Sequence, residues 1–159
     1  MKRLLGKYSE LFILKAFTKS YGMAGIRLGY CLCGDRKLLA DMGRAVQPWN
    51  VSLPAQMAGV AALQEIEFLQ QTKQIIQTER AWLCEQLKQL GIAVCQSRAN
   101  YLLFYSREEL GSKLMERGIQ IRDCSNYHGL GNGWYRIAVR LRADNIQLIS
   151  AVRDALEEL

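Results

Sequence analysis

In the first half of the chain, two short apolar runs are followed by stretches with hydrophobic residues at helical spacing. Residues 11–17 form an apolar run with a single charge, Lys15, and residues 28–33 form a second such run. Each run is typical of a buried strand. The stretches that follow place hydrophobic residues at helical spacing. The predicted helices are residues 36–46, residues 52–62 with Ser52 as the cap, and a long amphipathic helix over residues 65–90.

The second half of the chain changes to strands of period two, with two further helices. A glycine-rich segment, residues 127–133, separates the last two strands. A long helix and several shorter ones packed against a small, mainly antiparallel sheet define an α+β fold. The predicted strands are residues 92–95, 101–105, 119–122 and 134–140, and the predicted helices are residues 107–117 and 144–156.

Composition and charge narrow the range of functions. The 159 residues are 50% hydrophobic, which is enough for one compact domain with a core. No apolar run reaches the length of a membrane span, and the first residues lack the apolar core of a signal peptide. The formal charge of +6 comes from dispersed lysines and arginines. We therefore expect neither a nucleic-acid nor a membrane partner.

The cysteines and histidines argue against a metal site. His128 is the single histidine, and five cysteines are an odd number without a dense framework. We interpret the cysteines as free buried thiols in a reducing cytosol, so the expected location is cytoplasmic. The five cysteines are Cys31, Cys33, Cys84, Cys95 and Cys124.

One lysine follows the first apolar run closely. Lys19 lies eight residues before Arg27, and a loop with two glycines separates them. A lysine held in a site can become a nucleophile toward an aldehyde cofactor. A guanidinium and a loop of small residues suit a phosphate group on the same molecule. The alternative is that Lys19 and Arg27 are surface charges beside an ordinary turn.

A second pair of cations occurs in the predicted sheet. Arg122 and Arg136 hold comparable strand positions, fourteen residues apart, with the glycine-rich segment between them. Two guanidinium groups that converge could bind a dianionic or bis-anionic small molecule. The alternative is that both are solvated strand residues that share no ligand.

The lysine region resembles a known family. Thr18-Lys19 followed by Gly25-x-Arg27-x-Gly29 is similar to the lysine motif of fold-type I pyridoxal-phosphate (PLP) enzymes, the aspartate aminotransferase superfamily. The resemblance implies that Lys19 is the catalytic lysine that carries the cofactor. It implies that Arg27 binds the cofactor phosphate and that Thr18 lies beside it. It covers nearly the whole chain, but the chain covers less than half of such an enzyme.

The second half of the chain resembles one branch of this family. Residues 118–127 and 134–140 are similar to the branch of histidinol-phosphate aminotransferases and L-threonine-O-3-phosphate decarboxylases. The resemblance implies that Arg136 binds a substrate carboxylate, that Arg122 lies at the substrate phosphate, and that Asn100 contributes to substrate binding. Arg140 favours the decarboxylases of cobalamin biosynthesis over the aminotransferases of histidine biosynthesis or another class I/II transaminase. Trp49 either lines the site or belongs to the core.

The resemblance also implies an organisation for the whole protein. Residues 1–34 would end a large PLP-binding domain, and residues 35–159 would form the connecting helix and the C-terminal small domain. The expected substrate is a phosphorylated amine or amino acid, and the full-length enzyme is expected to be a homodimer. The 159-residue chain alone is expected to be inactive. A non-enzymatic α+β domain that binds anions is the competing hypothesis.

Overall fold

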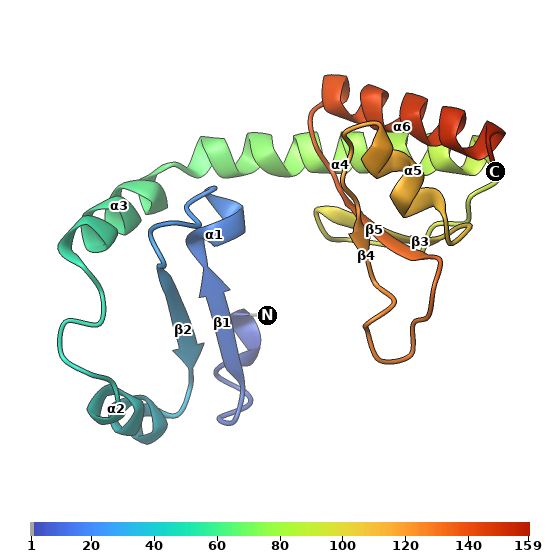
Figure 1. Ribbon diagram of the computed structural model, residues 1–159. Coiled ribbons are helices and arrows are strands. Elements are labelled where there is room, and N and C mark those ends of the chain that lie inside the picture. Colours follow the sequence, from blue (N-terminus) through green and yellow to red (C-terminus); the bar gives the residue numbers. More distant parts are fainter. Residues whose placement is uncertain (1) are drawn as a thin grey trace. The chain divides into compact units, whose positions relative to one another are not determined.

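The computed structural model describes residues 2–159, and its contacts divide the chain after Gln70 into two units. Unit 1 ends at Gln70 and unit 2 is Gln71–Leu159. Each unit is described by itself (Figure 1). The elements are η1 Lys2–Leu4, β1 Phe12–Ala16, α1 Phe17–Ser20, β2 Gly29–Cys33, α2 Arg36–Ala45, α3 Leu53–Gln64, α4 Ile66–Gln89, β3 Tyr101–Tyr105, α5 Leu110–Glu116, β4 Arg122–Asp123, β5 Trp134–Ala138 and α6 Arg142–Glu157.

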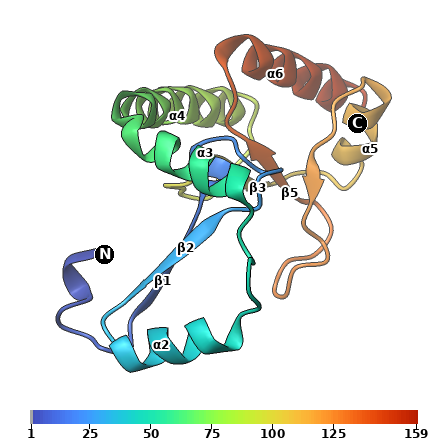
Figure 2. The same ribbon diagram turned by 90° about the vertical axis from the view of Figure 1, so that its left-hand side faces the viewer.

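Unit 1 contains a two-stranded antiparallel sheet. β1 and β2 pair from Phe12 with Cys33 to Ala16 with Gly29, and Figure 2 shows the two strands side by side. Both predicted strands are confirmed, but the first is one residue shorter than predicted at each end and the second begins one residue later. Phe17 leaves the strand and begins α1, while its N–H still donates to the Leu28 carbonyl at 3.1 Å.

Helices α2 and α3 of unit 1 begin at polar caps, and the cap of α3 at Ser52 was predicted from the sequence. The Asp35 side chain accepts a hydrogen bond from the Leu38 N–H at 3.0 Å at the start of α2. The Ser52 hydroxyl accepts one from the Ala55 N–H at 3.4 Å at the start of α3. Each cap satisfies one of the N–H groups that the first helical turn leaves without a partner.

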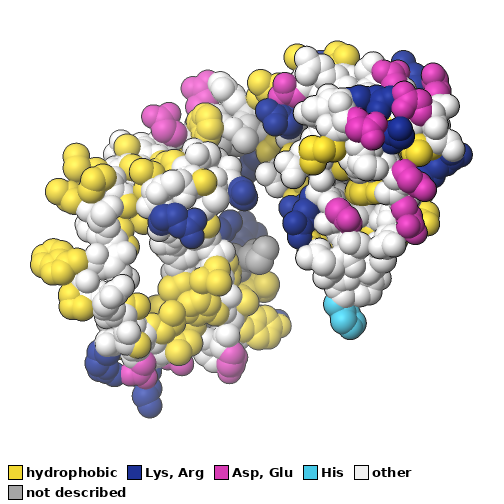
Figure 3. Space-filling model, in the orientation of Figure 1, with side chains coloured by type: hydrophobic (Ala, Val, Ile, Leu, Met, Phe, Trp, Pro, Cys, Tyr) yellow, Lys and Arg dark blue, Asp and Glu magenta, His cyan; other side chains and the backbone are white. Residues whose placement is uncertain are grey.

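Unit 1 exposes much of its apolar surface. Its buried residues are few, and Figure 3 shows hydrophobic side chains gathered over this unit. Trp49 is 94% exposed and Leu14 is 76% exposed, so the interpretation of Trp49 as a core residue is wrong. A two-stranded sheet is marginally stable unless other elements cover it. The buried residues of this unit are Ile13, Phe17, Ala55, Gly59 and Ala62.

Unit 2 is a three-stranded antiparallel sheet with helices on one face. The strand order is β3-β5-β4. Side chains that alternate along β3 and β5 point toward the helices and form the core with residues of α4, α5 and α6. The largest of these core side chains include Leu83, Leu87, Leu102, Phe104, Leu110, Leu114 and Val152.

Two predicted strands are wrong in extent. Residues 92–95 form no strand and contribute a single bridge, between Val94 and Phe104. The Ile92 N–H instead donates to the Leu87 carbonyl at 2.9 Å and closes the end of α4. The strand predicted over residues 119–122 shrinks to Arg122–Asp123, because the Ile119 N–H closes the end of α5 in the same way.

A polar network fixes the turn between β5 and α6. Asn145, which is 1% exposed, donates to the Glu79 carboxylate at 3.0 Å and to the Arg140 carbonyl at 2.8 Å. Its amide oxygen accepts from the Arg140 N–H at 3.1 Å. Arg142 makes two-pronged hydrogen bonds to Glu79 at 3.0–3.1 Å and lies 4.5 Å from the Trp82 ring. This network ties α4 to α6 within unit 2.

All five cysteines are free thiols. Cys124 is buried, Cys95 is exposed, and Cys31, Cys33 and Cys84 are half-buried. The interpretation as buried thiols therefore holds for one of them. Along residues 2–159, no helix combines the length and the apolar character that crossing a bilayer requires. Over the same residues, no cluster of three or more side chains is arranged to bind a metal ion.

Candidate functional site

The face of the unit 2 sheet that points away from the helices carries the two arginines. Arg136 of β5 is paired with Arg122 of β4 and with Leu103 of β3, so all three side chains emerge from the same face. The neighbouring positions Tyr135 and Ile137 point into the core. We call this surface the open face of the sheet. The two arginines therefore lie directly opposite each other on neighbouring strands.

Aromatic and amide groups surround the two guanidinium groups. Arg136 donates to the Tyr127 hydroxyl at 3.4 Å, and its guanidinium lies 5.1 Å from the Tyr101 ring centre. Arg122 donates to the Asn126 side-chain oxygen at 3.3 Å and lies 5.7 Å from the Tyr127 ring centre. Cation–π contacts at such distances hold a guanidinium in place without neutralising its charge.

Neither arginine has a carboxylate partner within the described part of the chain. The ion pairs there involve other residues. Asp123 is adjacent in sequence, but its carboxylate accepts a hydrogen bond from the Ser125 N–H at 2.8 Å. That backbone bond and the Ser125 hydroxyl lower the pKa of Asp123, with a smaller contribution from Arg122.

Two like charges directly opposite on neighbouring strands destabilise a sheet. The arginine pair, Arg122 and Arg136, therefore costs the fold stability when no ligand is bound. Such an uncompensated pair suits a ligand with two negative charges, because a guanidinium binds carboxylate or phosphate oxygens through paired donors.

The loop of residues 124–133 carries Tyr127 and is fixed at its base. The Cys124 N–H donates to the Trp134 carbonyl at 2.8 Å, and the Ser106 N–H donates to the Gly133 carbonyl at 2.9 Å. Gly133 has φ +82°, and a Cβ there would lie 2.5 Å from the Ser106 carbonyl oxygen. The loop therefore requires glycine at this position to close onto the sheet.

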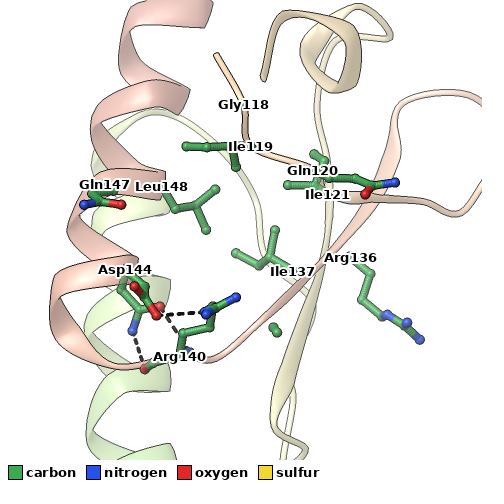
Figure 4. A pocket seen from close by; sticks show the side chains of 12 residues that line it. Gly118, Ile119, Gln120, Ile121, Arg136, Ile137, Arg140, Asp144, Gln147 and Leu148 are labelled. Atoms are coloured by element: carbon green, nitrogen blue, oxygen red, sulfur yellow. Dashed lines mark hydrogen bonds and ion pairs between the residues drawn. The ribbon is translucent and has the colours of Figure 1, made fainter. Parts of the chain in front are cut away.

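The pocket in Figure 4 is lined in part by Arg136 but not by Arg122. It has a volume of about 360 Å³, and Ile137 and Leu148 point into it. Arg140, which also lines the pocket, pairs with Asp144 at 2.8 Å. Arg136 extends away from α6, so its guanidinium belongs to the open face (Figure 4). The Arg140–Asp144 pair is a local contact at the start of α6.

The lysine motif lies in unit 1, in the short helix α1 and the loop after it. Lys19 is in the last turn of α1 and is exposed, while Thr18 is half-buried beside it. Phe17 anchors the helix, because its buried ring stacks on Tyr21 at 5.1 Å. Lys19 was predicted to follow the strand, and this short helix is what separates it from the strand end.

Arg27 ends the loop in an unusual backbone conformation. Its φ is +55°, a region that residues other than glycine rarely adopt. Arg27 is exposed, and within residues 2–159 no ion pair involves Arg27 or Lys19. An amine, a hydroxyl and a guanidinium, none of them paired with an acid, fit an aldehyde cofactor that carries a phosphate.

The remaining predicted site residue is Asn100, which immediately precedes β3. Its carbonyl accepts a hydrogen bond from the Val139 N–H at 2.9 Å, and its side chain is exposed. Tyr101 and Tyr127 were not predicted as neighbours of the arginines. Tyr101 could have been found from the alternation of β3, whereas Tyr127 lies in a glycine-rich loop that has no periodic pattern.

Comparison with known proteins defines the family. Residues 3–152 match the family described as aminotransferase class I and II. The chain therefore belongs to this family, whose members are PLP-dependent enzymes.

Relatives with two different activities match the chain. It is 35% identical to a histidinol-phosphate aminotransferase of Methanosphaera stadtmanae, over 97% of this chain and 44% of that protein. It is 38% identical to a threonine-phosphate decarboxylase of Salmonella typhimurium, over 92% of this chain and 42% of that protein. The chain thus spans less than half the length of these curated relatives.

A solved structure matches the whole fold. The histidinol-phosphate aminotransferase from Clostridium acetobutylicum superposes with a TM-score of 0.96 at 29% identity. The match covers 100% of this chain and 49% of that protein. The predicted fold, a small α+β domain together with the lysine-bearing strands of a fold-type I aminotransferase, is confirmed by this match.

Proposed function

We propose that the chain is the C-terminal part of a PLP-dependent enzyme that acts on a phosphorylated amino acid or amine. The observation that carries this proposal is the arginine pair on the open face, which has no carboxylate partner among the described residues. Relatives named for two phosphorylated substrates support it. We favour a threonine-phosphate decarboxylase-like activity, and a histidinol-phosphate aminotransferase is the alternative.

Three residues of unit 1 are proposed to hold the cofactor. Lys19 would bind its aldehyde carbon, and Arg27 and Thr18 would bind its phosphate. When bound, PLP supplies an electron sink for the pair of electrons released at the substrate Cα. The family match over residues 3–152 and the lack of acidic partners of Lys19 and Arg27 in the described chain support this assignment.

The residues of unit 2 are proposed to orient the substrate. Arg136 would bind the carboxylate and Arg122 the phosphate, with Asn100 contributing at the edge of the sheet. Fixing both ends of a molecule restricts which bond at its Cα is placed for cleavage. In a transaminase the Lys19 amine takes the Cα proton. In a decarboxylase the carboxylate leaves as CO₂, and the protonated Lys19 amine would donate the proton that the electron pair left at Cα takes up.

The properties of the whole protein are proposals as well. We propose a domain boundary near residue 34, and the end of β2 at Cys33 supports it. We propose that the full-length enzyme is a homodimer. We also propose that the 159-residue chain is inactive alone, since unit 1 buries few side chains around the lysine motif.

The test uses a full-length protein that contains this chain. After incubation with PLP and reduction with borohydride, peptide mass spectrometry should find the pyridoxyl group on Lys19. Lys19→Ala should lose the label and the absorption of the bound cofactor, while Lys15→Ala, a lysine of the adjoining strand, should keep both. A normal label in Lys19→Ala would refute the assignment.

The choice of reaction needs a second assay. The same protein should release CO₂ from O-phospho-L-threonine faster than it transfers an amino group from histidinol phosphate. The reverse order would assign it to the aminotransferases.

One observation also supports a second candidate function. The arginine pair and its aromatic neighbours lie entirely within unit 2, so an anion-binding domain without catalysis could use the same surface. Absence of any borohydride-fixed label, together with retained anion binding, would favour that function.

A further inference from the structure

We propose that Tyr127 is a positioning residue of the arginine pair and a third group that binds the anionic ligand. Its ring supports Arg122 at 5.7 Å, and its hydroxyl accepts a hydrogen bond from Arg136 at 3.4 Å. A single side chain therefore contacts both guanidinium groups. This inference rests on the proposed function for the identity of the ligand.

Tyr127 holds the two cations without cancelling their charge. Like charges opposite each other on neighbouring strands repel, yet Arg122 and Arg136 face one another in the register of the sheet. An acidic residue between them would stabilise the pair, but it would compete with an anionic ligand for the same donors. A neutral phenol stabilises both arginines and leaves their charge available.

The hydrogen-bonding capacity of the phenol gives it a further role. A tyrosine hydroxyl has one donor and can also accept. Arg136 has no acceptor group, so the Tyr127 oxygen accepts from it and keeps its own proton for another partner. Within the described chain, no protein group accepts that proton, and Tyr127 is 39% exposed. The proton can therefore be donated to the ligand oxygens that Arg136 binds.

The position of Tyr127 is set by its own loop. The Tyr127 N–H donates to the Cys124 carbonyl at 2.9 Å, and its carbonyl accepts from the Leu130 N–H at 3.0 Å. The Cys124 N–H in turn donates a hydrogen bond to the carbonyl of Trp134, the first residue of β5. Tyr127 is thus linked by main-chain hydrogen bonds to the strand that bears Arg136, as a positioning residue must be.

The test is a binding titration of a full-length protein that contains this chain, followed by NMR of the arginine Nε–Hε groups. O-phospho-L-threonine is the probe, with L-threonine and inorganic phosphate as separate arms. In the unaltered protein, the signals of Arg122 and Arg136 should both shift with O-phospho-L-threonine. Tyr127→Phe should raise the dissociation constant about tenfold or more, as expected for a lost hydrogen bond to a charged group.

Tyr105→Phe is the matched control, because Tyr105 is an exposed tyrosine of β3 whose described ring contact is with Trp134. Tyr105→Phe should bind the probe with unchanged affinity. Both Tyr105→Phe and Tyr127→Phe should keep the thermal midpoint of the unaltered protein. In Tyr127→Phe, the Arg136 signal should also shift before any probe is added. Tyr127→Leu should weaken binding further, because it removes the ring that supports Arg122.

The outcomes separate this inference from the proposed function. If Arg136→Gln abolishes binding while Tyr127→Phe binds like the unaltered protein, the role of Tyr127 is refuted and the arginine site remains. If the unaltered protein shows no shift with O-phospho-L-threonine, both the role of Tyr127 and the substrate assignment are overturned.

Discussion

Asn145→Ala should strongly destabilise unit 2. The side chain is almost completely buried and makes three hydrogen bonds, two with the Arg140 backbone and one with the Glu79 carboxylate. Each bond contributes about 1 kcal/mol net, and the bond to the carboxylate contributes more. The loss is therefore at least about 3 kcal/mol. Alanine recovers about 0.5 kcal/mol through its higher helix propensity, so the expected change is at least about 2.5 kcal/mol.

Urea unfolding followed by tryptophan fluorescence can measure this change in unit 2 specifically. Trp49 is the one tryptophan of unit 1 and is already exposed, so Trp49→Phe leaves Trp82 and Trp134 to report on unit 2. With a slope of about 1–3 kcal/mol/M, the midpoint of Asn145→Ala should fall by roughly 1 M or more. Trp82 is a sensitive reporter, because it packs against Arg142 of the same network.

The control is Ser150→Ala, an exposed position of the same helix. Ser150→Ala also places alanine in this helix, so it includes the gain in helix propensity, but it removes no buried side chain. A midpoint for Asn145→Ala that matches this control would show that the network does not stabilise unit 2, and the reasoning would be wrong.

Two further predictions concern the same unit. The hydrogen bonds from Arg142, and a weaker contribution from Asn145, lower the pKa of Glu79 below 4.5. The stability that ionised Glu79 contributes to unit 2 should therefore be complete above about pH 4.5 and lost as the pH falls through the lowered pKa. Urea midpoints between pH 3 and 6 should show this loss, and Glu79→Gln should flatten it; an equal slope in both proteins would contradict the assignment. Gly133→Ala should cost at least about 1–2 kcal/mol from its left-handed backbone and the contact of the new Cβ with a carbonyl oxygen. Gly131→Ala, where a Cβ meets no atom within 4 Å, should be nearly neutral, and equal thermal midpoints for the two variants would refute the argument.

The sequence predicts the order of elements well where the pattern is periodic. The long helix near residues 65–90 and the strand at residues 101–105 appear with nearly the predicted bounds. The wrongly predicted strand bounds lie directly after helices, where backbone N–H groups bond to the last turn of the helix. Ile92 and Ile119 carry apolar side chains of strand type, but their N–H groups close the helices before them. Alternation of side chains does not reveal which N–H groups a helix end will use.

The candidate site was predicted only in part, for a similar reason. Arg122 and Arg136 can be placed on strands from local pattern, but their direct opposition depends on the order β3-β5-β4 and its register. Lys19 was found through the motif, whereas the four-residue helix that holds it is too short to produce a period. Tyr127 contacts both arginines from an irregular loop, so only the structure identifies it.

The arginine pair can be tested most directly by changing Arg122 in a full-length protein that contains this chain. Arg122→Ala should weaken kcat/KM for O-phospho-L-threonine by about 1.5–3 kcal/mol, the size of a charged hydrogen bond, and should affect L-threonine much less. Arg107→Ala, an exposed arginine outside the open face, is the control and should leave both substrates unchanged. An equal loss on the phosphorylated and unphosphorylated substrates would contradict the assignment of Arg122 to the phosphate.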